Sequence, residues 1–149
     1  MNDNHTYDVD IKWDRERKGT MSSPVLDQQV EVATPPEFDK GIEGMWSPEH
    51  LFVASVSSCL MTTFLAIAEY SKLDFQDLKI KATGKLEKVE GKYMFSEITL
   101  RPVLTIKDEK FTEKAERILQ KSEEACLISN SIKTKVILEP EIVVAEMMA

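Results

Sequence analysis

The sequence is poor in the residues that staple small proteins or bind structural metals. It has two cysteines in 149 residues, Cys59 and Cys126, which are too few for a disulfide-stapled secreted scaffold. It has no C-x-x-C pair, and its two histidines are not spaced from the thiols as zinc ligands are. We therefore expect no metal and no other cofactor, and we expect both thiols to be reduced by default.

A basic surface is also absent. The formal net charge is −7, and no cluster of lysine and arginine forms the patch that phosphate binding requires, so the sequence argues against a nucleic-acid partner. The N-terminal stretch, MNDNHTYDVD, lacks the basic start and the apolar run of a signal peptide. With 42% hydrophobic and 30% charged residues, the chain is predicted to be a single cytoplasmic domain, residues 1–149, whose core needs no disulfide.

One stretch lacks charged residues altogether. Residues 51–68, LFVASVSSCLMTTFLAIA, approach the length of a membrane span. However, serine and threonine dilute the stretch, an acid stands on each side, and no lysine or arginine cluster sets an orientation. We therefore predict no membrane contact but a buried core helix over about 48–71. Ser47 is its expected N-cap, and Pro48 and Glu49 fit its first turn.

Alternation of apolar and polar residues predicts three strands before this helix. The clearest is a half-buried strand over 7–13, whose apolar face is formed by Tyr7, Val9, Ile11 and Trp13. A turn near Gly19 leads into the second strand, and residues 28–34 form the third. The loop that follows is long and rich in proline and glycine, which is typical of functional or mobile segments.

Further strands and a second helix are predicted after the apolar helix. Residues 78–90 and 92–106 form two strands joined at Glu90-Gly91, and Pro102 places the second of them at a sheet edge or a bulge. Asp108 caps an amphipathic helix, and residues 134–144 form a last strand or two. The expected buried positions are Ile98, Leu100, Pro102, Leu104 and Ile106 on the strand, and Phe111, Ala115, Ile118, Leu119, Ser122 and Cys126 on the helix.

This order of elements predicts an α+β fold. Strands and helices do not alternate strictly, so the sheet is expected to be mostly antiparallel, with a long buried central helix and a second, amphipathic helix. One sheet cannot cover a helix that is apolar on all sides. A second copy of the chain is the simplest candidate to cover the rest, which predicts a homodimer.

Four residues stand out as chemical candidates, although each has an ordinary structural explanation. Cys59 and Cys126 can both be small buried apolar residues, Glu49 can simply favour the helix dipole, and Arg17 can be surface charge. A hydrolase or transferase with Cys59 as nucleophile is disfavoured, because no base with an orienting partner is visible and His50 is the only plausible base.

Two motifs resemble those of the OsmC/Ohr family, named for osmotically inducible protein C and organic hydroperoxide resistance protein. The segment SPEHLFVASVSSCLMTTF resembles the family's helix signature, in which a reactive cysteine follows a Pro-Glu pair by ten residues, as Cys59 follows Glu49. The run from Cys126 to Ser131 resembles the second family motif. The likeness in element order extends over nearly the whole chain.

The resemblance implies a thiol-dependent peroxidase with an OsmC-like fold, built as an intertwined homodimer. Cys59 resembles the peroxide-reacting cysteine, Cys126 the resolving cysteine, and Glu49 the carboxylate that orients a catalytic arginine. Arg17, in Arg17-Lys18-Gly19, best matches that arginine, although Arg15 and Lys18 remain alternatives. The implied partners are an organic hydroperoxide, or hydrogen peroxide, as substrate and an external dithiol of the lipoyl type as reductant.

The chain departs from the Ohr branch in three places. Leu127 replaces a usual proline, Glu123 stands where a histidine is frequent, and Glu16 replaces the first glycine of the arginine turn. We therefore assign the chain to the general OsmC-like members. The alternative function is a non-enzymatic OsmC-like dimer that binds a small apolar ligand or partner and has structural cysteines.

The helix geometry adds an expectation about Glu49. Ten residues of straight helix correspond to about 15 Å, so either the helix breaks near 52–56 or Glu49 serves the cysteine of a partner chain. A Cys59–Cys126 disulfide needs Cα atoms within about 7 Å. Candidates for an apolar substrate pocket, which are equally candidates for an ordinary core, are Met45, Phe52, Met61, Phe64, Leu127 and Ile128.

Overall fold

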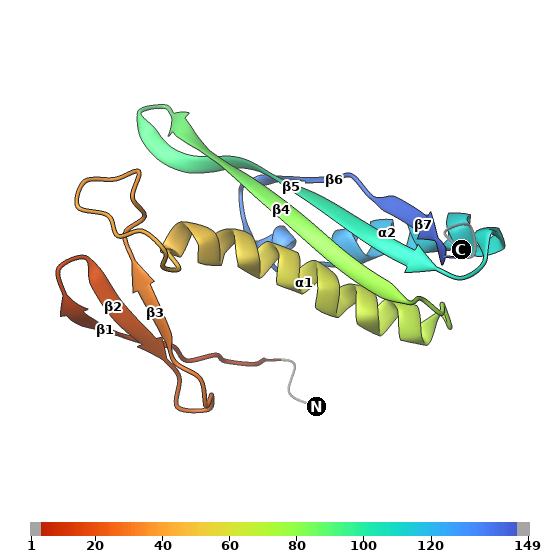
Figure 1. Ribbon diagram of the computed structural model, residues 1–149, viewed down its shortest axis with the longest axis horizontal. Coiled ribbons are helices and arrows are strands. Elements are labelled where there is room, and N and C mark those ends of the chain that lie inside the picture. Colours follow the sequence, from red (N-terminus) through yellow and green to blue (C-terminus); the bar gives the residue numbers. More distant parts are fainter. Residues whose placement is uncertain (1–3, 146–149) are drawn as a thin grey trace. The chain divides into compact units, whose positions relative to one another are not determined.

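The computed structural model describes residues 4–145, which form two compact units, a first that runs to Phe52 and a second that starts at Val53. Figure 1 shows the order of the elements along the chain. Strands and two α-helices are present as an α+β arrangement, as predicted. Whether the two units behave as the single domain expected from the sequence stays a prediction.

The first unit contains the three predicted strands. They form an antiparallel sheet in the order β1-β2-β3. The bounds are β1, Asp10–Arg15; β2, Lys18–Ser22; and β3, Val30–Ala33. The long loop that follows β3 is tied back to it, because the Ala33 N–H donates to the Trp46 carbonyl at 2.9 Å. The segment is therefore an ordered part of this unit.

The predicted turn at Gly19 is wrong. The chain turns at Glu16 and Arg17, where Glu16 adopts a φ of 50°. Gly19 lies inside β2 opposite Trp13. A Cβ at this position would lie 2.7 Å from the carbonyl oxygen of Lys12 on β1, so the glycine permits close approach of two strands and does not form the turn.

The first strand is not half-buried in the single chain, which corrects a second prediction. Every residue of β1 is exposed. The alternating apolar side chains are the most notable part of this surface, with exposed fractions of 88% for Tyr7, 66% for Val9, 65% for Ile11 and 72% for Trp13. The alternation is present in the sequence, but among the described residues no element covers the face.

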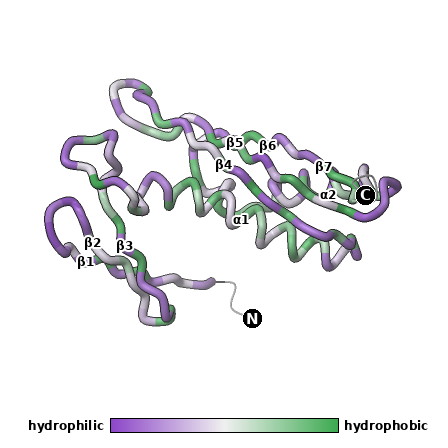
Figure 2. Tube along the Cα trace, viewed as in Figure 1, coloured by the Kyte–Doolittle hydropathy of each residue, from purple (hydrophilic) through white to green (hydrophobic). Residues whose placement is uncertain are grey.

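The apolar helix α1 (Pro48–Tyr70) has the predicted bounds and the predicted cap. The Ser47 hydroxyl accepts the backbone N–H of His50 at 3.1 Å. The helix continues unbroken to Tyr70, so the predicted alternative of a break near 52–56 is not found. Its apolar residues continue along its length (Figure 2), and by length and composition alone it could cross a membrane, with 28% of its most apolar stretch buried.

Within the second unit, α1 behaves as a core helix on one face. Its buried residues are Val56, Cys59, Leu60, Phe64 and Ala68. In contrast, Met61 and Leu65 are 42% and 41% exposed. The expectation that one sheet cannot cover the whole helix therefore agrees with the structure of this unit.

The sheet of the second unit is built around a long hairpin. The strands β4 (Asp77–Val89) and β5 (Lys92–Ile106) are antiparallel, and Glu90 and Gly91 join them with φ values of 53° and 81°. Two consecutive positive φ values fit the twist of a two-residue hairpin turn. The short strands β6 (Lys135–Leu138) and β7 (Glu141–Val144) both pair with β5 in parallel.

The prediction that Pro102 marks an edge strand or a bulge is wrong. β5 is the central strand of this sheet, and Pro102 lies opposite Ile80 on β4. On the other side of β5, the Leu100 carbonyl accepts the N–H of Glu139, which follows β6. The backbone of Pro102, two residues further along β5, faces the same side as that of Leu100. The pairing on this side is interrupted between β6 and β7, so a residue without an N–H is tolerated there.

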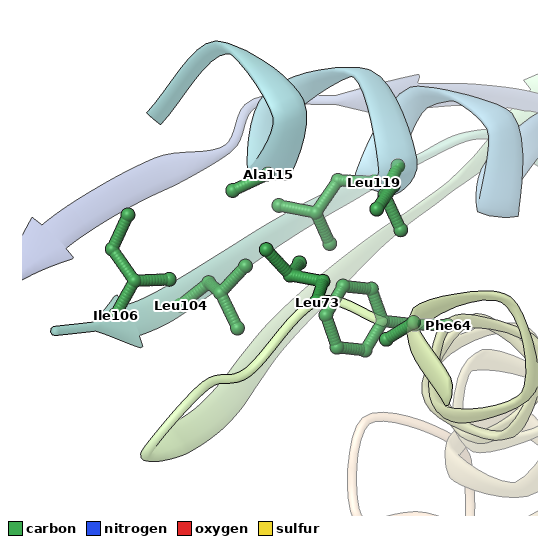
Figure 3. Close-up of a cluster of buried hydrophobic side chains, with 8 residues drawn as sticks. Phe64, Leu73, Leu104, Ile106, Ala115 and Leu119 are labelled. Carbon is green, nitrogen blue, oxygen red and sulfur yellow. The ribbon is translucent and has the colours of Figure 1, made fainter. Parts of the chain in front are cut away.

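The helix α2 (Thr112–Glu124) completes the core. A short 3-10 turn η1 (Glu109–Phe111) precedes it, and the Asp108 carboxylate caps that turn by accepting the N–H of Lys110 at 3.0 Å. The predicted buried stripe is confirmed except at Phe111, which is 41% exposed because it lies in the preceding turn. Side chains of α1, of the segment that follows it, of β5 and of α2 meet in one cluster (Figure 3): Phe64, Ala68, Leu73, Leu104, Ile106, Ala115, Ile118 and Leu119.

Candidate functional site

The two cysteines lie together in the second unit. Cys59 is on α1, and Cys126 follows the end of α2. The thiols are hydrogen bonded to each other, and neither is in a disulfide. Cys59 is 8% exposed and Cys126 is completely buried. The fold therefore brings two reduced thiols, separated by more than half of this unit in sequence, into direct contact.

The surroundings of Cys59 favour its thiolate. Burial raises the pKa of Cys59, but hydrogen bonds from the Cys126 thiol, the Ile128 N–H, the Thr63 hydroxyl and the Leu127 N–H lower it, and the lowering prevails. The Thr63 Oγ1 lies 3.8 Å from the Cys59 sulfur. Several donors thus converge on one sulfur atom, which is the arrangement that stabilises an anion.

The surroundings of Cys126 have the opposite effect. Burial raises the pKa of Cys126, and so do its hydrogen bond to Cys59 and the charge that Cys59 carries. Hydrogen bonds from the side chain and the backbone of Ser129 lower this pKa but do not prevail. The two pKa values are therefore pushed apart, so that Cys59 ionises first and Cys126 keeps its proton.

The segment after α2 is held in place by its own hydrogen bonds. The Cys126 N–H donates to the Glu123 carbonyl at 3.1 Å, and the Asn130 N–H donates to the Cys126 carbonyl at 3.0 Å. The Asn130 side chain also donates to the Glu124 carbonyl at 3.2 Å. A short 3-10 turn, η2 (Ser129–Ser131), ends the segment. The N–H groups near the Cys59 sulfur are therefore fixed by a tight helix terminus.

Two further predicted site residues, Glu49 and Arg17, lie in the first unit. The Oε1 atom of Glu49, in the first turn of α1, is buried and has no hydrogen-bond partner among the described residues. Arg15 and Arg17 are exposed, and neither forms an ion pair within the described part of the chain. Lys18, the third candidate cation, forms an ion pair with Glu31 at 2.7 Å. The assignment of a cation to Cys59 stays a prediction.

The predicted pocket residues have different environments. Phe64 is fully buried in the core cluster, where it stacks edge to face with Phe75. Met61 and Leu127 are 42% and 66% exposed. The remaining candidates are half-buried: Met45, Phe52 and Ile128. Phe64 therefore has the packing role that the sequence left open, while Met61 and Leu127 present apolar surface in the unit that holds the cysteines.

Sequence reasoning missed several groups that surround the thiols. Thr63 follows Cys59 by four residues, which places both side chains on the same face of a helix. This spacing is sufficient to predict that the two side chains are neighbours. The sequence does not predict that the N–H groups of Leu127, Ile128 and Ser129 point towards the thiols, because their direction depends on how α2 ends. Within residues 4–145, no group of three or more potential metal ligands is present.

Comparison with known proteins gives consistent similarities. A family model described as "OsmC-like protein" matches residues 39–141. The uncharacterized protein YmaD of Bacillus subtilis is 28% identical over 146 residues, which are 95% of each chain. An OsmC-like protein of unknown function from Vibrio cholerae has a TM-score of 0.82 and 25% identity, over 92% of this chain and 99% of that one.

Another solved structure has a similar fold. An organic hydroperoxide resistance protein from Elizabethkingia anophelis has a TM-score of 0.76, with 19% identity over 97% of this chain and 99% of that chain. At this level of identity the likeness concerns the fold. This likeness confirms the predicted α+β fold of the single chain, while the predicted homodimer stays a prediction.

Proposed function

The chain belongs to the OsmC-like family, and from this premise we propose that it is a thiol-dependent peroxidase that reduces organic hydroperoxides, and also hydrogen peroxide, through Cys59. One observation carries the proposal. Two reduced thiols are in contact, and their environments push their pKa values apart, down for Cys59 and up for Cys126. Such a pair suits a nucleophile and a resolving thiol.

The reaction follows from these states. The Cys59 thiolate attacks one peroxide oxygen, a sulfur–oxygen bond forms, the O–O bond breaks, and the leaving alkoxide takes a proton to become an alcohol. Cys59 is then a sulfenic acid. Cys126 attacks its sulfur, a disulfide forms, and the hydroxyl group leaves as water. An external dithiol, of the lipoyl type by family resemblance, reduces the disulfide by thiol exchange.

An arginine is proposed to complete the site. Guanidinium keeps its charge and can bind both a thiolate and a peroxide oxygen. The buried Glu49 Oε1, which has no partner among the described residues, is suited to accept a guanidinium N–H and to orient the group. Arg17 is the proposed donor, and because α1 has no break between Glu49 and Cys59, Glu49 is proposed to serve the Cys59 of a second copy of the chain.

Peroxide consumption tests the proposed function directly. Reduced protein is mixed with cumene hydroperoxide or hydrogen peroxide and a dithiol, and consumption is followed for wild type, Cys59→Ser, Cys126→Ser and Ser58→Ala. Cys59→Ser is expected to abolish turnover, because the attacking atom is lost. Cys126→Ser is expected to stop after one turnover with Cys59 oxidised, and Ser58→Ala, an exposed neighbour on α1, is the control with wild-type activity.

The same assay separates the alternatives. Turnover that Cys59→Ser leaves unchanged, or the absence of turnover with every peroxide and dithiol, would sink the peroxidase proposal. The non-enzymatic dimer with structural cysteines would then be the better explanation.

A further inference from the structure

The end of α2 places an acid, a hydroxyl and a thiol in a row. The Ser129 hydroxyl donates to the Glu123 carboxylate at 3.4 Å between Oγ and Oε2. Ser129 also forms hydrogen bonds with Cys126 from both its side chain and its N–H. The Cys126 N–H, bound to the Glu123 carbonyl at 3.1 Å, keeps the thiol and the acid on the same turn. One hydroxyl therefore connects the Cys126 sulfur with a carboxylate.

We propose that Glu123 accepts the proton of Cys126, through the Ser129 hydroxyl, when Cys126 attacks Cys59. The inference rests on the proposed function, because it names the base for the resolving step. A serine hydroxyl has one proton and two lone pairs. In the reduced protein the Cys126 S–H donates to Cys59, but oxidised Cys59 is no longer a thiolate, and the S–H can then turn to the Ser129 hydroxyl, which donates to Glu123. One proton then moves along each hydrogen bond, and the new thiolate faces the Ser129 N–H.

The resolving step needs such a base. Only a thiolate attacks sulfur efficiently, whereas burial raises the pKa of Cys126 and favours its protonated form. Burial also raises the pKa of Glu123, against the hydrogen bond from Ser129, which lowers it. A carboxylate that has become more basic is a better match for a thiol donor, and proton transfer to it is correspondingly easier.

Other charged groups do not take over this role. The turn η2, which packs on α2, carries no charged residue. The turn η1 carries Glu109 and Lys110 at the opposite end of α2, and β7 carries Glu141. None of these contributes to the pKa shift of Glu123, whose causes are burial and Ser129. On α2 itself, the Glu124 carboxylate accepts a hydrogen bond from Gln120 at 3.4 Å.

The step balances without an added reactant. The sulfur of Cys126 forms a bond with the sulfur of Cys59, and the Cys59 sulfur–oxygen bond breaks. The departing hydroxide takes a proton from solvent to become water, while the Cys126 proton rests on Glu123 and then returns to solvent. Cys126 is oxidised as the sulfenic sulfur is reduced to the disulfide level.

A peroxide-independent experiment isolates this step. An aromatic bis(nitrobenzoate) disulfide, whose thiolate leaving group absorbs visible light, is added to the reduced protein. The Cys59 thiolate takes up one half and releases the first nitrobenzoate thiolate, and Cys126 then displaces the second. The rate constant of the second release, measured from about pH 5 to pH 9, reports the nucleophilic step of Cys126.

The expected result is a change in pH profile, which a purely structural role would not produce. The wild-type rate is expected to fall only at low pH, where Glu123 is protonated. Glu123→Gln is expected to slow the second release about tenfold at neutral pH and to make it rise with pH towards the thiol pKa, and Ser129→Ala is expected to do the same. Glu123→His, which keeps a base, is expected to restore the rate above about pH 6.5. Glu124→Gln is the matched control with a wild-type profile.

The outcomes decide between the two proposals. A Glu123→Gln variant with the wild-type pH profile would overturn the proton-acceptor role, and so would a wild-type protein that releases only one nitrobenzoate thiolate. A wild-type protein that releases both, with the expected variant profiles, but consumes no peroxide would support this role and contradict the peroxidase function. Failure of the two proposals is therefore distinguishable.

Discussion

The two cysteines show how far local environment differentiates identical residues. Cys59 has donors from α1 and from the segment after α2, and its pKa is lowered. Cys126 is completely buried and donates to Cys59, and its pKa is raised. Which of the two thiols ionises more readily thus follows from hydrogen bonding and burial, independently of any family motif.

Thr63 is the donor whose contribution is simplest to test at this scale. Its hydroxyl lies 3.8 Å from the Cys59 sulfur, and it lowers the pKa of that thiol. In Thr63→Val the shape is kept and the donor is lost, so the pKa of Cys59 is expected to rise. Because the thiolate exists above the pKa, the pH profile of iodoacetamide alkylation should move to higher pH, with a rate about threefold lower at neutral pH.

Thr62→Val provides the matched control for this measurement. The Thr62 hydroxyl donates to the Cys59 carbonyl at 3.2 Å and not to the sulfur, so the alkylation profile is expected to stay as in wild type. Equal shifts in both variants would mean that the effect comes from the helix and not from a hydrogen bond to sulfur.

At the scale of elements, α2 joins the core to the site. Its buried face packs on β5 and α1, and its end carries the second thiol. Leu119 is completely buried in the core cluster. Leu119→Ala is therefore expected to lower the free energy of unfolding by about 3 kcal/mol, through lost burial and a residual cavity. Urea unfolding measures the loss, and Glu116→Ala, on the exposed face of α2, should change it by less than about 0.5 kcal/mol.

The elements differ in how well their sequence predicts them. Periodicity and local signals were sufficient to predict α1, with its Ser47 cap, and the hairpin around Glu90 and Gly91. The residues that determine these elements are neighbours in sequence. Pro102 and Gly19 were misinterpreted, because their roles depend on the strand beside them. A proline at an interruption of the partner strand and a glycine at a close strand contact have no local signature.

The same distinction applies to the candidate site, where local sequence predicts some features and tertiary packing determines the others. The positions of Cys59 and Cys126 and the helix spacing of Thr63 could be obtained from the sequence. The N–H groups of Leu127 and Ile128, and the hydrogen bond between Ser129 and Glu123, depend on the exact path of the chain after α2. Contacts of this kind arise from tertiary packing and not from composition or periodicity.

At the scale of the whole molecule, exposed apolar faces indicate assembly. The side chains of Tyr7, Val9, Ile11 and Trp13 are between 65% and 88% exposed, and α1 exposes Met61 and Leu65. Groups of exposed apolar side chains are often covered in an assembly. The proposed partner is a second copy of the chain, which would also supply the Glu49 of one protomer to the Cys59 of the other.

Substitution in the first strand tests this assembly. Ile11→Glu places a charge on the apolar face and is expected to convert a dimer into a monomer, because a buried unpaired carboxylate is costly. Lys12→Glu, on the opposite face of the same strand, is the control that should remain dimeric. Light scattering after size-exclusion chromatography gives the mass, and a wild-type monomer at high concentration, or a dimeric Ile11→Glu, would contradict the assignment.

The interrupted pairing beside Pro102 has a consequence for biosynthesis. The ribosome releases the chain from the N-terminus, so β4 and β5 emerge well before β6 and β7, which end at Val144. Until then one side of β5 is an open edge that a neighbouring nascent chain can use for pairing. A proline in the middle of that edge withholds a donor where a foreign strand would need one. The residue that the finished sheet tolerates is therefore expected to disfavour misassociation of the unfinished one.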